Sequence, residues 1–358
     1  MRSRPTGFAG HYPRPLLVAT SSVWRARCCA EVTAMSDGKV VVLMAAYNVA
    51  EFINEAIESV LRQSYGHFEL HIFDDGSRDD TLSLAAAYTD PRVQIHHWPG
   101  HANKGKASCL NYLMEHTQCD YYMMMDADDT AHPRRIELNI QAAQADPERV
   151  LVMSGHELIV GAQRMAPNGH FYAASEVKQI FKNCRMPAHD PTMFFRADIG
   201  RELGFDEEQR LGQGVDFCQR LSERGAVHVL PDVLYHYRIN PGSITHRQSS
   251  AKTEFVYRVV AKAAERRGHP IPTREQFEND NRRWLNDDNN LAGHFLESVR
   301  YQMATGQVAG AWRTVVQSLQ LMPCRRRSTY KASAGFLIGL VTAGWWHGRA
   351  NANRGAAS

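Results

Sequence analysis

Cysteine is sparse in this chain and follows no disulfide or metal-binding pattern. The 358 residues include seven cysteines, an odd number, and no two of them stand at a C-x-x-C spacing. This pattern disfavours both a small domain cross-linked by disulfides and a zinc site with cysteine ligands. We expect free thiols in a reducing compartment, which favours the cytoplasm.

Long apolar segments are also missing. The stretch 332–346 has 15 uncharged residues, whereas a helix that crosses a bilayer needs about 20. It follows three arginines at 325–327 and ends in two tryptophans, which favours a helix lying in a membrane interface. A C-terminal helix packed on the protein itself is the alternative.

Acidic residues are almost absent from both ends of the chain. Residues 1–34 carry five arginines and one acid, and residues 298–358 carry eight basic residues and no acid, so the segment between them has a net charge of −9 within a total of +3. Basic ends favour contact with an anionic surface. No base-stacking aromatic motif accompanies them, so we expect no nucleic acid partner. We predict that the tail 323–358 holds the protein peripherally on the cytoplasmic membrane face.

The N-terminal segment lacks the features of a secretion signal. Residues 1–34 contain one short apolar run, at 16–19, with no clean cleavage site after it. We expect this segment to be disordered, or to be a non-native extension before a start at Met35. An acid-poor transit peptide is the alternative.

From residue 39 the sequence alternates apolar strands with amphipathic helices. Helical spacing of apolar residues, as at 53–61, separates the strands predicted at 39–48, 68–73, 93–96, 121–125 and 151–154. A Ser77-x-x-Asp80 capping box is expected to start the helix after the second strand. This rhythm predicts an α/β fold with a mainly parallel sheet flanked by helices.

The second half of the chain has a weaker pattern. We expect less regular structure from 155 to about 185, then an apolar strand after His189-Asp190, and another strand at 234–238. Asp216 lies in the first turn of a helix, where the helix dipole alone would favour a carboxylate. From residue 248 only helices are expected, at 249–267, 273–303 and 307–321.

Carboxylates follow two of the predicted strands at their C-terminal ends. Asp74 and Asp75 follow the second strand, and Asp126, Asp128 and Asp129 follow the fourth. Ligands bind at this edge of open α/β sheets, and crowded carboxylates favour a cation such as Mg²⁺ or Mn²⁺. The sequence therefore predicts a divalent metal that holds a phosphate. A solvated acidic turn before the helix that Pro133 begins is the alternative.

Several short motifs lie at the predicted strand ends and in the loops: Ala46-Tyr47-Asn48, Asp74-Asp75-Gly76-Ser77, Asn103-Lys104-Gly105, Asp126-Ala127-Asp128-Asp129, His189-x-Pro-Thr-Met-Phe-Phe-Arg and Tyr237-Arg238 with Gly242-Ser243-Ile244. In this order and at these separations, over roughly 39–247, they resemble the family 2 glycosyltransferases with the GT-A fold. The ordered set is far more specific than any one motif.

The resemblance implies a role for each matching residue. Asp75 would read the nucleotide base, Asp126 would lie near the ribose, and Asp128 would be the metal ligand of the D-x-D motif. Asp216 would be the general base, although Val215 replaces the glutamate that usually precedes it. Ala45 stands where relatives often have a small polar residue. The other implied contacts are Tyr47, Asn48 and Lys104 on the nucleotide-sugar side and His189 and Asp190 on the acceptor side.

The resemblance also implies an organisation and an activity. Residues 35–247 would form the GT-A catalytic domain, with a nucleotide-sugar half at 35–130 and an acceptor half at 131–247, followed by a helical extension at 248–322. One metal, Mn²⁺ or Mg²⁺, and one base suffice for direct displacement, so a nucleotide-diphospho-sugar would transfer its hexose to an acceptor hydroxyl with inversion. A lipid-linked or cell-surface polysaccharide precursor would be the acceptor.

Two rival functions come from other classes. A non-catalytic family member that acts as a binding or regulatory protein is suggested by the departure at Val215. A haloacid dehalogenase-like phosphatase is suggested by the D-x-D-x-T pattern from Asp126 to Thr130. That class needs a later paired acidic motif, which the sequence lacks.

Overall fold

The computed structural model describes residues 38–160, 163–209, 211–239, 249–280, 298–299, 302–303 and 306–321. The expectations for 1–34, for the turn at 240–244 and for the tail 323–358 lie outside the described residues. Within these ranges, no helix is both long enough and apolar enough to cross a membrane.

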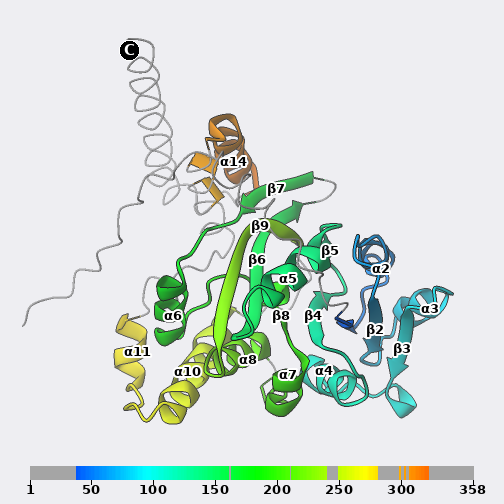
Figure 1. Cartoon of the computed structure of the whole chain (residues 1–358), viewed down its shortest axis with the longest axis horizontal. Helices are drawn as coiled ribbons and strands as arrows, with labels where there is room; N and C mark the ends of the chain where they lie inside the picture. Colours follow the sequence, from blue (N-terminus) through cyan, green and yellow to red (C-terminus); the bar gives the residue numbers. More distant parts are fainter. Residues whose placement is uncertain are drawn as a thin grey trace, which may run out of the picture. The chain divides into compact units, whose positions relative to one another are not determined.

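A single sheet runs in the order β3-β2-β1-β4-β8-β6-β9-β5, with β7 paired to β6 (Figure 1). Its first part is parallel and confirms the predicted strands: β1 Val40–Ala46, β2 Phe68–Asp74, β3 Val93–His97 and β4 Tyr121–Asp126. β1 and β4 are buried on both faces and are therefore continuous apolar runs, whereas β3 at the end of the sheet is partly exposed and carries polar residues.

The second part of the sheet is mixed, with antiparallel pairs that the sequence did not predict. It consists of β5 Thr130–Ala131, β6 Arg149–Val160, β7 Gln163–Asn168, β8 Phe194–Arg196 and β9 Ala226–Arg238. β8 runs antiparallel to both β4 and β6, while β6 and β9 are parallel. Since β8 runs opposite to β4, its first residues meet the C-terminal end of β4.

Helices cover both faces of the sheet because alternate strand residues point to opposite sides. In β1, Val40, Val42 and Met44 join the core under one set of helices, and Val41 and Leu43 join the core under the other set. The first set is α2 Ile53–Leu61, α3 Thr81–Ala86 and α5 Arg135–Gln144. The second set is α4 Lys106–Glu115, α6 Ala174–Lys182, α7 Ala197–Leu203 and α8 Gln213–Ser222.

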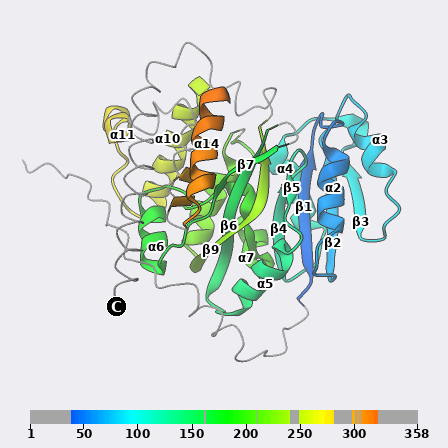
Figure 2. The same ribbon diagram turned by 90° about the horizontal axis from the view of Figure 1, so that it is seen from above.

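The expected C-terminal helices are present where the structure describes them. They are α10 Ser249–Arg266, α11 Arg274–Asp280 and α14 Val308–Leu321. Figure 1 shows α8 between α7 and α10, and Figure 2 shows α10 and α11 at the end of the sheet opposite to α3. The structure differs from the expectation in two places. β6 extends well past residue 154, and the region up to 185, expected to be less regular, contains β7 and α6.

Candidate active site

The parallel strands end at one edge of the sheet, where the strand order changes direction. β2 and β3 lie on one side of β1, and β4 lies on the other. Ligands of open α/β sheets bind at such a switch point, beyond the carboxyl ends of the strands. Ala45 is paired with Asp126 across this point. The predicted donor residues that follow β1, β2 and β4 are therefore brought to one edge.

Hydrogen bonds join the loop after β1 to the loop after β2. Asn48 has a left-handed backbone, with φ of 52°. Its N–H donates to Ser77 Oγ at 3.0 Å, and its Oδ1 accepts from the Arg78 N–H at 2.8 Å. The predicted capping box is wrong, because Ser77 is used in this way and α3 begins after Asp80 with no side-chain cap. Asn48 shapes the loop, and the neighbouring Tyr47 is 41% exposed.

Asp75 is buried, and its carboxylate holds the loop that precedes α4. Oδ1 accepts from the Lys104 N–H at 2.8 Å and from Trp98 Nε1 at 3.1 Å, and Oδ2 accepts from the Gly105 N–H at 2.8 Å. A carboxylate has about four lone-pair positions, so the protein itself uses most of them. Base recognition by Asp75 stays a prediction, but the residue clearly builds this part of the site.

Two lysines, Lys104 and Lys106, flank Gly105. Lys104 was the predicted site residue, but it is Lys106 that contacts the acids. Lys104 Nζ lies over the Trp98 ring, 4.0 Å from its centroid. Lys106, at the start of α4, donates to Asp126 Oδ1 at 2.5 Å. Burial opposes its charge, but Asp126, Asp190 and Asp128 together raise the pKa of the Lys106 ammonium. The Gly-Lys pair was a visible signal, but the sequence could not say which lysine faces the site.

Three carboxylates gather after β4. One oxygen from each of Asp126, Asp128 and Asp129 lies within 4.8 Å of the others. Asp129 is already engaged, because Oδ2 accepts from the Tyr235 hydroxyl at 2.5 Å and Oδ1 accepts from the Arg238 N–H at 2.7 Å. These partners lie on β9, more than 100 residues away in the chain. The sequence did not predict that they contact Asp129.

Asp128 and the Oδ2 of Asp126, whose Oδ1 accepts from Lys106, remain as ligands for a cation. Burial, followed by the negative charge of Asp126, raises the pKa of the Asp128 carboxyl to about 6. A pair of close, repelling carboxylates is a hard-oxygen donor set that a divalent cation would stabilise. The residues present therefore fit the expected Mn²⁺ or Mg²⁺.

Replacing Lys106 by methionine would test whether its positive charge stabilises the neighbouring carboxylates. We expect the metal-free variant to lose about 1 kcal/mol or more, because Asp126 and Asp128 lose a counter-charge, and its Tm to fall by roughly 2–4 °C or more. Mn²⁺ should then raise the Tm of the variant more than that of the wild type, since the site is more negative.

Thermal unfolding in EDTA and in Mn²⁺ measures both effects of the Lys106 substitution. Lys182→Met is the matched control, because Lys182 lies on the exposed side of α6. A Lys106→Met protein with the wild-type Tm in EDTA and the wild-type response to Mn²⁺ would contradict the expectation.

The predicted acceptor-side residues lie beside this cluster. His189 Nδ1 is 3.2 Å from Asp190 Oδ1, and the His189 ring packs edge-on against Tyr237. Burial opposes ionisation of Asp190, but the hydrogen bond from His189 and the charges of His189 and Lys106 outweigh it and lower the pKa of the carboxyl. Asp190 is therefore an ionised carboxylate within the field of Lys106.

One buried arginine joins the acceptor side to β4. The Arg135 side chain is fully buried, and its guanidinium donates to the Met124 carbonyl at 2.9 Å and to the Pro191 carbonyl at 2.7 Å. It also stacks on Tyr235, with 4.8 Å to the ring centroid. Burial, only partly offset by Tyr235 and Asp126, lowers the pKa of Arg135 to about 10. Nothing in the local sequence marks Arg135 as central, because its partners are distant in the chain.

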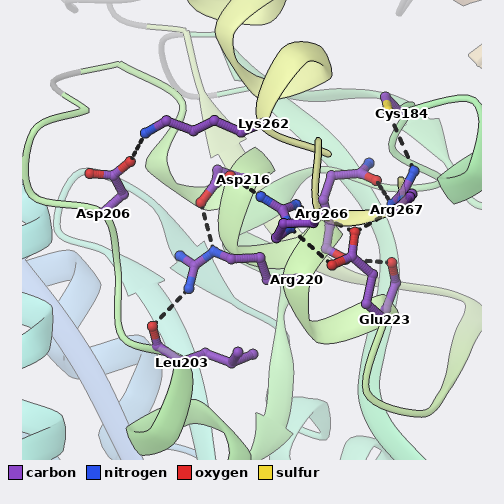
Figure 3. Close-up of polar contacts among 11 residues, drawn as sticks. Cys184, Leu203, Asp206, Asp216, Arg220, Glu223, Lys262, Arg266 and Arg267 are labelled. Atoms are coloured by element: carbon purple, nitrogen blue, oxygen red, sulfur yellow. Dashed lines mark hydrogen bonds and ion pairs between the residues drawn. The ribbon is translucent and has the colours of Figure 1, made fainter. Parts of the chain in front are cut away.

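The predicted base, Asp216, lies in a different group of residues. Its carboxylate is about 2% exposed, accepts from Arg220 Nε at 2.8 Å and lies 3.6 Å from an Arg266 nitrogen (Figure 3). A cavity of about 240 Å³ adjoins it, lined also by Asp206 and Lys262. Asp216 is not one of the three acids that gather after β4, although Gly214 in the same helical turn packs against Asp190. Its role as the base stays a prediction.

Comparison with known sequences finds similarity to glycosyltransferases over part of the chain. Residues 41–201 match the model of glycosyl transferase family 2. The chain is 25% identical over 220 residues to an uncharacterized glycosyltransferase of Rickettsia typhi, an alignment that covers 60% of this chain and 68% of the relative. It is 29% identical over 215 residues to the succinoglycan biosynthesis protein ExoO of Rhizobium meliloti, covering 57% and 61% of the two chains.

Comparison with solved structures identifies the fold. S. aureus TarS 1-349 in complex with UDP-GlcNAc has a TM-score of 0.54 at 17% identity, over 78% of this chain and 83% of that one. The mannosyltransferase PcManGT from Pyrobaculum calidifontis, in complex with GDP-Man and Mn²⁺, has a TM-score of 0.52 at 18% identity, over 90% and 93%. Residues 41–201 therefore belong to glycosyl transferase family 2, and they are carried on a GT-A fold.

Proposed function

We propose that this protein transfers a sugar from a nucleotide-diphospho-sugar to an acceptor hydroxyl with inversion at the anomeric carbon. The observation that carries the proposal is the group formed by Asp126, Asp128 and Lys106 at the switch point of the sheet. Nucleotide-sugar donors are present in the complexes of TarS and PcManGT, and the same donor class suits an edge that offers both a cation site and a lysine.

Each part of the site has a task in this reaction. Asp126 and Asp128 would hold Mn²⁺ or Mg²⁺, whose charge stabilises the leaving diphosphate. Lys106 adds a fixed positive charge beside the same place. Asp75 keeps the loop 103–105 against the strand ends, with Tyr47 open to solvent on the loop after β1. A carboxylate on the acceptor side would remove the proton of the attacking hydroxyl.

A screen of donors tests this function. The purified chain would be heated with UDP-, GDP- and dTDP-sugars, each with Mn²⁺, with Mg²⁺ or with EDTA. Since a ligand that binds only the folded protein raises its stability, the correct donor should raise the Tm by several degrees, and only with metal. Release of nucleoside diphosphate with water as acceptor then separates an enzyme from a non-catalytic family member. No metal-dependent shift with any of these donors would contradict the proposal.

The acceptor is proposed to be a lipid-linked or cell-surface polysaccharide precursor. ExoO is named for succinoglycan biosynthesis, and the basic C-terminal tail would hold the enzyme at a membrane face. The proposed location is therefore the cytoplasmic face of the membrane, reached through a peripheral contact.

Replacing the three arginines at 325–327 by glutamine should weaken membrane binding. Each basic residue near an anionic surface contributes about 1 kcal/mol, so the partition onto vesicles with 30% anionic lipid should fall roughly a hundredfold at low salt. Sedimentation with vesicles measures this. The control is Lys178→Gln with Lys182→Gln, which removes charge from the exposed side of α6. Equal sedimentation of the arginine variant and wild type would argue against the tail contact.

A further inference from the structure

We propose that Tyr235 is a positioning residue for the loop 126–129, here called the acidic loop, and that Asp129 is the anchor of this loop and not a ligand of the cation. The assignment rests on the proposed function, in which the other two acids of the loop hold the metal. Asp129 is only 1% exposed. Its Oδ2 accepts from the Tyr235 hydroxyl at 2.5 Å, and its Oδ1 accepts from the Arg238 N–H at 2.7 Å. Each oxygen of Asp129 is thus bonded to β9.

The path of the chain carries the acidic loop to Tyr235. β4 ends at Asp126, and the loop leads directly into β5. β5 pairs antiparallel with β9, with Ala131 opposite Tyr235. Register fixes which residues lie opposite each other in a strand pair. The contact between Asp129 and Tyr235 is therefore a consequence of how β5 pairs with β9.

The Tyr235 hydroxyl contacts both ends of the acidic loop. It donates its proton to Asp129, and its oxygen accepts from the Asp126 N–H at 3.2 Å. A hydroxyl has one proton and two lone pairs, so it can make both bonds at once. The distance of 2.5 Å to Asp129 lies in the range of charge-assisted hydrogen bonds, which are about twice as strong as neutral ones. The loop is therefore held on both sides of Asp128.

Packing fixes the ring that carries this hydroxyl. The Tyr235 side chain is fully buried in the core under α2, α3 and α5. The Arg135 guanidinium stacks on the ring, and the His189 ring lies edge-on to it, 6.4 Å away between centroids. Arg135 also donates to the Pro191 carbonyl at 2.7 Å. Tyr235 thus sets the position of the acidic loop relative to the turn 189–191 on the acceptor side.

The position of the acidic loop matters because a cation needs its carboxylates at a fixed separation. Asp126 and Asp128 carry like charges, whose repulsion favours moving them apart when no cation is bound. The bonds of Tyr235 on both sides of Asp128 oppose this movement. Residues that hold metal ligands in place through hydrogen bonds typically contribute about 10- to 100-fold to metal affinity. We therefore expect the Tyr235 hydroxyl to act on metal binding as well as on folding.

Replacing Tyr235 by phenylalanine tests this role, because it removes the hydroxyl and keeps the ring. Mn²⁺ would be titrated into the folded protein, alone and with UDP, GDP or dTDP according to the donor found by the screen. Electron paramagnetic resonance would measure the free Mn²⁺. We expect the affinity for Mn²⁺ to fall by about tenfold or more. A folded Tyr235→Phe protein that binds Mn²⁺ with the wild-type affinity would overturn the proposal.

Tyr122→Phe is the matched control for this substitution. Tyr122 is also fully buried, and its hydroxyl donates to the Met114 carbonyl at 2.9 Å. It lies near the start of β4, at the opposite end from the acidic loop. We expect a lower Tm in both variants and a loss of Mn²⁺ affinity only in Tyr235→Phe. An equal loss of Mn²⁺ affinity in Tyr122→Phe would trace the effect to general destabilisation and overturn the proposal.

Asp129→Asn tests the anchor and decides the question if Tyr235→Phe does not fold. Asparagine can still accept from the Arg238 N–H and can donate to the Tyr235 oxygen, so the Mn²⁺ affinity should fall less than about tenfold. Asp128→Asn loses a charged ligand and should fall by about a hundredfold or more. Equal losses in the two variants would make Asp129 a ligand and overturn the proposal.

The double variant of Tyr235→Phe with Asp129→Asn gives a second measurement. If both substitutions act through one hydrogen bond, the double variant should bind Mn²⁺ about as well as Tyr235→Phe, whereas independent effects would add. Additive losses would overturn the role of Asp129 as the anchor. A wild-type chain that binds no Mn²⁺, alone or with any of the three diphosphates, would refute the metal-dependent function instead, so the two failures are distinguishable.

Discussion

Replacing Asp128 by asparagine is expected to lower sugar transfer by roughly a thousandfold or more while the protein remains folded. Asparagine has nearly the same shape but no charge, so the cation that stabilises the leaving diphosphate would lose a charged ligand. Such a cation lowers the activation free energy by several kcal/mol, and each 1.36 kcal/mol changes the rate by a factor of ten.

The same substitution should not destabilise the metal-free protein. Asp128 is buried beside the like charge of Asp126, and removing one of two close carboxylates relieves their repulsion. We therefore expect an equal or higher Tm in EDTA together with a much smaller rise on adding Mn²⁺. If Asp128 served only in an acidic turn that caps a helix, its replacement would not lower activity while leaving stability equal or higher.

Diphosphate release at saturating donor, and thermal unfolding with and without Mn²⁺, measure the two effects. Asp146→Asn serves as the control, because Asp146 forms a partly exposed ion pair with Arg149 and lies outside the site. Unchanged turnover by Asp128→Asn at limiting Mn²⁺ or Mg²⁺ would show that Asp128 is not a metal ligand.

Replacing Arg135 by methionine is expected to cost about 3–5 kcal/mol of folding free energy. The substitution leaves the buried carbonyls of Met124 and Pro191 without their donor, and each unmet buried polar group costs about 1–3 kcal/mol. It also removes a positive charge that faces Asp126 and Asp129 in the protein interior, and breaking a buried charge pair on one side has a cost in this range.

Arg134 offers an adjacent control for this experiment. It forms an ion pair with Glu137 at 2.8 Å, and its side chain is 54% exposed, so Arg134→Met should cost less than about 1 kcal/mol. Urea unfolding of both variants gives the comparison. We also expect Arg135→Met to lose activity, because the turn that carries Asp190 would no longer be held to β4. Similar unfolding free energies for the two variants would exclude Arg135 as a structural link.

The parallel half of the fold could be predicted because its signals are local. Buried parallel strands are continuous apolar runs, and the residues at their C-terminal ends meet at one edge whatever the details of packing. The same reasoning predicts that Asp75, Asp126 and Asp128 follow strands that end at this edge. Terminal and mixed strands give weaker patterns, which is why β7 and α6 were not expected and why the direction of β8 was not anticipated.

The side chains that the sequence could not assign are those whose partners are distant. Lys104 and Lys106 look alike in the chain, but the turn at Gly105 directs one toward Trp98 and the other toward Asp126. Asp216 pairs with Arg266 of α10, 50 residues further along the chain, and no local pattern predicts that contact.

The sequence by itself determined the fold class, the edge where the donor would bind and the acidic motif suited to a metal, since apolar periodicity and strand ends depend on neighbouring residues alone. Only the tertiary structure decided which charged side chains face that edge. The antiparallel β8 and the buried Arg135 hold the turn that carries Asp190 beyond the end of β4. Such contacts join residues far apart in the chain, and their geometry depends on strand direction and packing, which no local pattern encodes.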